Sequence, residues 1–345
     1  MMLFMHYSQV TQQIEDWFSQ HAREFPWRKQ STPWGRLVSE FMAQQTQIDR
    51  VAKRWPVFMK RFPSPKSLAE SSEQEVLLLW QGLGYYKRAK HLKQTAEMIV
   101  NEFSGEVPRD VKDLKKLQGI GRYTAGAVAS LAFNEPEPIV DGNVHRVLCR
   151  LFDYDEDPLP CDWTWEHAEQ LVSSCKSPKN CNEGLMELGA TICTPRKPQC
   201  EICPVQQSCL ACKAGTQNLI PLPKPSTKKT LLYHHAVIMS DGESIAFEQR
   251  KQKGLWAGMW QVPTLETTSQ LDASEVAIKL GIDNELKSIG SFKHVLTHRI
   301  IEFKVFYCDA KIDSQNNSRF DWYLRDQIKD IPLANAQKKV LATQT

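Results

Sequence analysis

The sequence predicts a larger all-α domain followed by a smaller α+β domain. The chain has 345 residues, which is more than one domain of about 150 residues accounts for. Apolar residues recur at helical spacing through the first two thirds of the chain, whereas the alternation typical of strands begins only at Leu231. A stretch rich in proline and lysine separates the two patterns. We therefore expect a first domain over 1–214, a linker over 215–230 and a second domain over 231–345.

Each expected element is a periodic apolar stretch between turns that carry proline or glycine. The first helix is expected to begin at Ser8, whose hydroxyl can cap it, with Val10, Ile14 and Trp17 on one face. The remaining helical stretches of the first domain are Leu37–Phe41, Val51–Phe58, Val76–Trp80, Ala89–Phe103, Asp110–Leu117, Ala125–Phe133, Val144–Phe152 and Leu185–Cys193. In the second domain, we expect strands at Leu231–Met239, Ser244–Arg250 and Ile300–Cys308 and a helix at Ala273–Leu280.

Composition narrows the class of protein. Hydrophobic and charged fractions of 41% and 24% are those of a soluble globular chain. No run approaches the roughly 18 apolar residues of a membrane span. The opening Met1–Met5 lacks a basic region and a cleavage site, so we expect no signal peptide and a cytoplasmic protein. The net charge of +3 does not by itself indicate a nucleic-acid partner.

Half of the ten cysteines fall between Cys193 and Cys212. The spacing Cys193-x6-Cys200-x2-Cys203-x5-Cys209 can hold an iron–sulfur cluster or a zinc ion. The single CxxC and the uneven spacing favour the cluster, and zinc or unligated thiols stay open as alternatives. The stretch 193–229 carries six lysines and arginines against one glutamate, which suits either a DNA backbone or a solvated linker.

The motif Leu117–Gly126, which reads LQGIGRYTAG, predicts a tight hairpin between two helices. Gly119 and Gly121 flank Ile120, which we expect to anchor the hairpin in the core. The backbone amides that open the following helix can then bind a DNA phosphate without reading sequence. An ordinary helix–helix turn is the alternative.

Two carboxylates lie on separate predicted helices. Glu40 stands among apolar neighbours, and burial would raise its pKa and keep it protonated. Asp141 stands at a helix start, where the helix dipole favours its ionised form. An acid and a carboxylate of this kind suit cleavage of a glycosidic bond. An exposed glutamate and a simple N-cap aspartate are the alternatives.

Taken together, these motifs resemble a known family. In chain order, the segments that carry the resemblance are Pro26–Arg28, Ser39–Gln47, Gly82–Tyr86, the LxGxG hairpin, Asp141–Val144, Met186–Ala190 and the cysteine loop. They resemble the helix-hairpin-helix DNA glycosylases of the endonuclease III superfamily and, within it, the MutY-type adenine DNA glycosylases. The resemblance is dense from about residue 8 to 212. It continues more thinly through Gly254–Trp260 and Phe292–His298.

The resemblance implies an enzyme of base excision repair that removes adenine mispaired with 8-oxoguanine, or with guanine, from duplex DNA. The target base must leave the stack to be reached. Glu40 would protonate adenine N7, Asp141 would stabilise the sugar cation, and Asn143 would help to place the attacking water. The family also implies one [4Fe-4S] cluster on Cys193, Cys200, Cys203 and Cys209. We expect a monomer associated with the nucleoid.

Tyr123 distinguishes between branches of the superfamily. The glycosylase–lyases have a lysine at this place, and a tyrosine cannot form a Schiff base. We therefore expect a monofunctional glycosylase in which Tyr123 bonds to Asp141 or to the sugar. A bifunctional endonuclease III-like glycosylase–lyase and a non-catalytic binder of damaged DNA are the alternative functions.

The resemblance also implies how DNA is held. Gln45 would wedge into the duplex, and Tyr85 would intercalate beside the lesion base. Trp27, Arg28 and Glu187 would contribute to the adenine pocket.

The second domain resembles the Nudix-like domain of the same family. It lacks the glutamate-rich metal box of the hydrolysing Nudix enzymes, because Glu275 stands alone. Thr297 and His298 would reach the 8-oxoguanine. Leu296 replaces the aromatic residue that usually precedes this pair.

Overall fold

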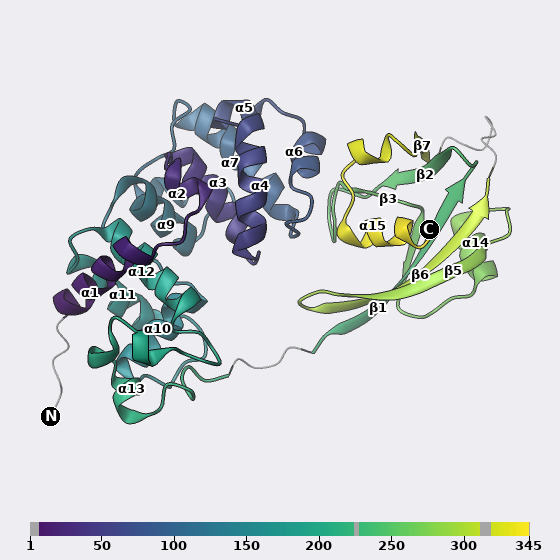
Figure 1. The fold of residues 1–345 in the computed structure, drawn as a ribbon. Helices are drawn as coiled ribbons and strands as arrows, with labels where there is room; N and C mark the ends of the chain where they lie inside the picture. The colour runs from purple at the N-terminus through teal and green to yellow at the C-terminus, as the bar shows by residue number, and fades with distance from the viewer. Residues whose placement is uncertain (1–6, 224–227, 311–318, 345) are drawn as a thin grey trace. The chain divides into compact units, whose positions relative to one another are not determined.

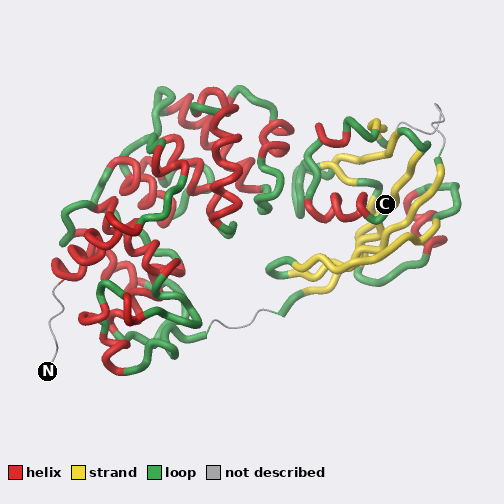
Figure 2. The backbone as a smooth tube through the Cα atoms, viewed as in Figure 1, coloured by secondary structure: helices red, strands yellow, loops and turns green. Residues whose placement is uncertain are grey.

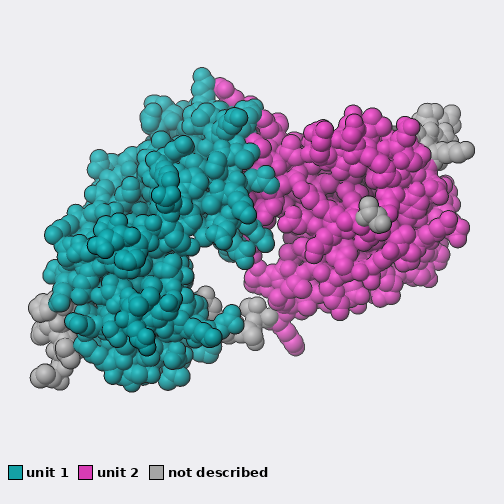
Figure 3. All heavy atoms as spheres, viewed as in Figure 1, with its two compact units in different colours: residues 1–69, 94–225 teal, residues 70–93, 226–345 magenta. Residues whose placement is uncertain are grey.

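The computed structural model describes residues 7–223, 228–310 and 319–344. Contacts divide the chain into two compact units, Met1–Ala69 with Gln94–Pro225 and Glu70–Lys93 with Ser226–Thr345 (Figure 3). The opening Met1–Met5 and residues 224–227 of the expected linker lie outside the described residues. The functional domains expected at 1–214 and 231–345 stay a prediction.

The first unit is built from helices (Figures 1 and 2). They are α1 (Tyr7–His21), α2 (Pro26–Lys29), α3 (Pro33–Ala43), α4 (Ile48–Arg61), α5 (Pro65–Ala69), α8 (Val111–Leu114), α9 (Arg122–Phe133), α10 (Gly142–Phe152), α11 (Asp162–Ser173), α12 (Pro178–Thr191) and α13 (Leu210–Ala214). Two 3₁₀ turns, Cys200–Ile202 and Gln206–Ser208, lie in the cysteine loop. Helix α7 (Lys87–Glu102) runs from the second unit into the first.

Three helix contacts position the pocket described below. Helix α3 packs against α9, and α12 packs against both α1 and α10. Helices α10 and α12 lie close together at Gly189, where an added Cβ would lie 2.7 Å from the Cβ of Asn143. A larger residue at this position would push the start of α10 away, so glycine is what allows this packing.

Two local predictions for the first unit are wrong. Ser8 does not cap the first helix, because α1 already includes Tyr7, whose ring packs on Phe152 at a centroid distance of 5.9 Å. The helix expected over Asp110–Leu117 is only α8, a single turn capped by Asp110. It ends early because the chain tightens into successive turns before the glycine hairpin.

The second unit combines a mixed sheet with helices. Its strands are β1 (Thr230–Ser240), β2 (Ser244–Gln249), β3 (Trp260–Gln261), β4 (Thr264–Thr267), β5 (Lys287–Val295), β6 (Arg299–Asp309) and β7 (Asp321–Leu324). Its helices are α6 (Glu73–Leu79), α14 (Ala273–Leu280) and α15 (Asn335–Ala342), with a 3₁₀ turn at Ile328–Asp330. The strand order is β3-β2-β1-β6-β5. Strands β1 and β6 run parallel, and the other paired strands are antiparallel.

The α+β prediction for the second unit is confirmed, and α14 has the predicted bounds. Its residues Val276 and Leu280 pack against Val237 and Phe306 on one face of the sheet. Strand β5 was not expected from the sequence, because it lies at the sheet edge and none of its side chains is fully buried. Its apolar alternation is therefore weak. Across the described ranges, no helix has the length and apolarity that a membrane crossing requires.

Candidate active site

A cavity of about 750 Å³ opens in the first unit. Its walls come from α3, α9 and α12 and from the start of α10. Glu40, Tyr123, Asp141, Asn143 and Glu187 all line it. The structure therefore brings together residues that lie as much as 147 positions apart in the chain, as expected from the resemblance.

Glu40 lies in a stretch of α3 in which every residue is buried, and it is itself only 6% exposed. Burial raises the pKa of its carboxyl to about 7, while the Arg36 charge and a hydrogen bond from Tyr123 oppose the rise. One oxygen, Oε2, is buried and has no hydrogen-bond partner among the described residues. Near neutral pH the carboxyl therefore holds its proton in a substantial fraction of molecules.

Asp141 is the N-cap residue of α10. Its Oδ1 accepts hydrogen bonds from the backbone amides of Asn143 (2.8 Å) and Val144 (2.7 Å). Its Oδ2 accepts one from the Asn143 side-chain amide at 3.1 Å. Such a cap is local and sequence-encoded, and here it fixes a carboxylate at the cavity wall.

Tyr123 lies on the first turn of α9 and donates a hydrogen bond to Glu40. Burial, followed by the charges of Glu40 and Asp141, raises the pKa of its hydroxyl well above the ordinary value. The hydroxyl is therefore neutral and acts as a donor. The sequence suggested Asp141 or the sugar as its partner, whereas its partner in the described structure is Glu40.

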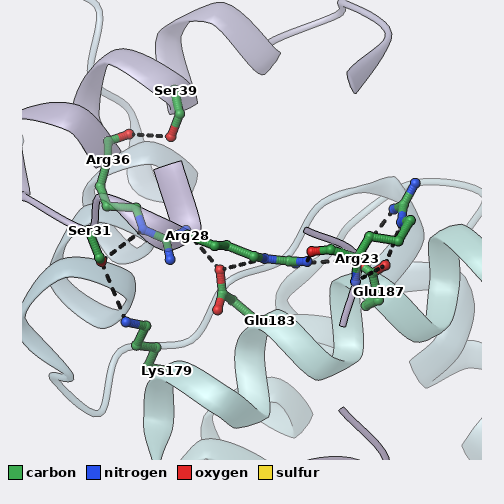
Figure 4. A network of polar contacts seen from close by, with 8 residues as sticks. All are labelled: Arg23, Arg28, Ser31, Arg36, Ser39, Lys179, Glu183 and Glu187. Atoms are coloured by element: carbon green, nitrogen blue, oxygen red, sulfur yellow. Dashed lines mark hydrogen bonds and ion pairs between the residues drawn. The ribbon is translucent and has the colours of Figure 1, made fainter. Parts of the chain in front are cut away.

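The polar wall of the cavity is a network of arginines and glutamates (Figure 4). Arg28 donates to Glu183 (Nε–Oε1, 3.2 Å) and to Glu187 (Nη2–Oε2, 3.1 Å). Arg23 adds a second ion pair to Glu187 (Nε–Oε1, 2.5 Å). Trp27 is buried, and its ring stacks on Phe25 at 4.9 Å. Trp27, Arg28 and Glu187 thus meet at one cavity, and their role in an adenine pocket stays a prediction.

Sequence reasoning missed Arg23, Arg36 and Glu183, which also line the cavity. One signal was available, because Arg36 stands four residues before Glu40 and Glu183 stands four residues before Glu187. This spacing places each pair on one helix face. The signal is weak, because many surface ion pairs have the same spacing.

The hairpin has the predicted form. Gly119 adopts a φ of +79°, which favours glycine, and Gly121 is the N-cap residue of α9. Ile120 between them is 7% exposed and anchors the turn in the core, whereas both glycines are exposed. The first amides of α9 are therefore positioned to meet a phosphate.

Two residues expected to enter DNA have left-handed backbones. Gln45 has a φ of +54° and Tyr85 a φ of +46°, and both side chains are exposed. Non-glycine residues in this region are uncommon and cluster at functional sites. Within the second unit, the Tyr85 hydroxyl lies 2.5 Å from Thr297 Oγ1. Thr297 and His298 are exposed in the turn between β5 and β6.

The cysteine loop offers four thiols to one cavity, lined by Cys193, Cys200, Cys203 and Cys209, with Cys212 also at its wall. The buried Arg150 guanidinium donates to Cys193 Sγ at 3.4 Å and to the Thr194 carbonyl at 2.8 Å. Hydrogen bonds and positive charge near the sulfur atoms suit an anionic thiolate-bound cluster. The donor set therefore fits an iron–sulfur group.

In the second unit, Glu275 has a structural role. Its carboxylate accepts a hydrogen bond from the Asp272 amide at 2.9 Å, and Asp272 in turn caps the first turn of α14. This reciprocal capping accounts for a glutamate at that position.

Three family models match the chain. Residues 38–171 match the HhH-GPD superfamily of base excision DNA repair proteins, and residues 193–209 match the iron–sulfur binding domain of endonuclease III. Residues 234–343 match the NUDIX domain. The helical unit with its hairpin and cysteine loop defines a helix-hairpin-helix DNA glycosylase of base excision repair.

The relatives narrow this class. An adenine DNA glycosylase of Buchnera aphidicola is 33% identical over 96% of this chain and 97% of its own length. One from Mus musculus is 41% identical over 94% of this chain and 75% of its own. The chain belongs to the adenine DNA glycosylase family. The expected class is thereby confirmed: a monofunctional N-glycosylase of base excision repair that acts on adenine and carries a [4Fe-4S] cluster.

Solved structures agree with the helical fold. A thermostable thymine-DNA glycosylase matches 60% of this chain and 97% of its own with a TM-score of 0.56 and 32% identity. A non-covalent endonuclease III–DNA complex matches 60% of this chain and 95% of its own with a TM-score of 0.50 and 25% identity. DNA is the partner of this enzyme.

Proposed function

We propose that the enzyme removes adenine opposite 8-oxoguanine, or opposite guanine, in duplex DNA. The observation that carries the proposal is the shared cavity of Glu40 and Asp141, with Glu40 buried and Asp141 fixed on a helix N-terminus. The buried site of Glu40 suits a proton donor, whereas the helix N-terminus that holds Asp141 suits a carboxylate that stabilises positive charge. Such a pair can act on a glycosidic bond in two steps.

In the first step, the protonated Glu40 gives its hydrogen to N7 of an extrahelical adenine. The neutral base then leaves with the electron pair of the C1′–N9 bond. Proton transfer to the leaving group is general acid catalysis, which contributes about 10²–10⁴-fold. Tyr123, a neutral donor to Glu40, orients the carboxyl during this transfer.

In the second step, the Asp141 carboxylate stabilises the positive charge that develops on the sugar. Its backbone hydrogen bonds from α10 leave it little freedom to move. Water then attacks C1′ and returns a proton to Glu40. Asn143, held beside Asp141, helps to place that water.

DNA recognition divides between the two units. The Gly119–Gly121 hairpin binds backbone phosphate, and Gln45 fills space in the duplex. Tyr85, Thr297 and His298 contact the 8-oxoguanine. The exposure of these side chains and the left-handed backbones of Gln45 and Tyr85 support these roles.

The cluster is proposed to be held by Cys193, Cys200, Cys203 and Cys209. When bound, it cross-links the loop and keeps the exposed Arg196 and Lys197 in place for phosphate.

We further propose that the chain divides into a glycosylase domain up to residue 214 and a lesion-recognition domain from residue 231. We propose that the enzyme works as a monomer and that it acts on the chromosome in the nucleoid.

Single-turnover release of adenine from an A:8-oxoguanine duplex tests the proposal. Glu40→Gln keeps the shape of the side chain and cannot supply the proton, so we expect duplex binding with excision reduced by about 10³-fold or more. Glu166→Gln on the exposed side of α11 is the matched control and should excise at the wild-type rate. Wild-type excision by Glu40→Gln would contradict the proposal.

A further inference from the structure

The side chain of Arg36 is a buried cation in the cavity wall, one helical turn before Glu40 on α3. It is 1% exposed. Its Nη1 donates to Glu183 Oε1 at 2.7 Å and its Nε to Ser31 Oγ at 3.3 Å (Figure 4). The remaining nitrogen, Nη2, is buried and has no partner among the described residues. One nitrogen of a fully buried guanidinium, with both of its N–H groups, is thus left unused beside the cavity.

Stability does not account for this arrangement. Removing a guanidinium and a carboxylate from water costs several kcal/mol per ion, and a hydrophobic residue of similar size is often as stable at such a place. Leu37 and Val38, its neighbours on α3, are such residues and are fully buried. A buried ion pair at the edge of a reactive cavity is therefore better explained by its electric field.

Charges face Glu40 from each element of the cavity. They are Arg36 on α3, Asp141 before α10, Glu183 and Glu187 on α12, and Arg23 and Arg28 around the start of α2, and the neutral hydroxyl of Tyr123 on α9 joins them. Glu187 is neutralised by two arginines, Arg23 and Arg28. Arg36 favours the ionised form of Glu40, whereas Glu183 and Asp141 favour the protonated form. Arg36 and Glu183 thus act on the same carboxyl in opposite directions.

We infer that Arg36 and Glu183 are positioning residues that set how readily Glu40 holds and gives its proton. Neither one has to touch the substrate for this purpose. Burial raises the pKa of Glu40, and the positive charge of Arg36 opposes this rise. The negative charge of Glu183 in turn offsets part of the effect of Arg36. The inference rests on the proposed role of Glu40 as the acid.

The pH dependence of single-turnover adenine release tests the pair. Activity should fall as the pH rises through the value at which Glu40 ionises. Glu183→Gln removes a negative charge, so we expect this fall to move to lower pH by about half to one unit. Arg36→Met removes a positive charge, so we expect an equal movement to higher pH. The double variant should return close to the wild-type profile.

Two control variants separate charge from structure. Arg36→Lys keeps a cation at the site, so the midpoint should move much less than in Arg36→Met. Lys179→Met removes a cation that contacts Ser31 from outside the cavity (3.5 Å) and should not move the profile. A purely structural role for Arg36 would lower the rate at every pH without moving the midpoint.

The outcomes are distinguishable. Unmoved midpoints, or movement of both variants in one direction, would overturn the inference if Glu40→Gln is inactive, and the proposed function would stand. An active Glu40→Gln would overturn the proposed function instead. If Arg36→Met does not fold, Glu183→Gln still decides, because an unmoved midpoint in that variant contradicts the inference by itself.

Discussion

Asn143 and Cys193 are held by the same guanidinium. Arg146 donates from Nη2 to Asn143 Oδ1 at 2.9 Å and from Nε to the Cys193 carbonyl at 2.8 Å. One side chain therefore joins the cavity of Glu40 and Asp141 to the first cysteine of the loop. Order in the loop and order at the start of α10 depend on each other through this contact.

Loss of a cluster ligand should consequently reach beyond the loop. In Cys203→Ser, we expect loss of the brown colour and at least a tenfold weaker affinity for duplex DNA, or failure to fold, because the basic loop is no longer tied down. Absorbance near 400 nm and a DNA titration measure the two effects. Cys308→Ser, in the second unit and far from this loop in sequence, is the control. Unchanged affinity in a colourless Cys203→Ser protein would contradict the prediction.

Gly189→Ala tests the contact between α12 and α10. The new Cβ would lie 2.7 Å from the Asn143 Cβ and would displace Asn143 and its partner Asp141. We expect excision to slow by about 10²-fold, since small displacements of catalytic groups have effects of this size. Gly184→Ala lies on the same helix but meets Ile14 instead. It should lower the melting temperature with a smaller effect on excision by the folded enzyme, and equal effects would refute the prediction.

Burial of Glu40 should make stability depend on pH. Its folded pKa of about 7 lies above the ordinary 4.5, so the folded state binds more protons between these values. The contribution of Glu40 to the free energy of unfolding is fully present below pH 4.5 and is lost as the pH rises through 7. At pH 8 the loss is about 3 kcal/mol. Glu40→Gln should therefore raise the melting temperature by several degrees at pH 8 and by little at pH 5, and a pH-independent difference would count against this explanation.

Thr297→Ala tests lesion recognition. The Thr297 hydroxyl bonds to Tyr85 in the described structure. In the proposed complex, Tyr85 enters the DNA and this hydroxyl turns to the lesion base. Because one hydrogen bond contributes about 0.5–1.5 kcal/mol, we expect the preference for A:8-oxoguanine over A:G to fall about two- to tenfold. The ratio of single-turnover rates on the two duplexes measures it. Thr268→Ala, an exposed threonine after β4, should leave this ratio unchanged.

The sequence predicted the Asp141 cap and the glycine hairpin because each depends only on residues a few positions away. Asp141 caps α10 with amides two and three residues away, and the two glycines of the hairpin set their own turn. The edge strand β5 escaped prediction because none of its side chains is fully buried, so its sequence carries little apolar alternation.

By itself, the sequence determined the chemical groups: a glutamate among apolar residues, a capping aspartate, a tyrosine in place of a lysine, and four spaced cysteines. Only the tertiary structure decided that Glu40 pairs with Tyr123 and that Arg36 meets Glu183 across 147 positions. Caps and turns depend on bonds within a few residues. The charge on a buried carboxyl depends on every group that packing brings near it, and packing is a property of the whole unit.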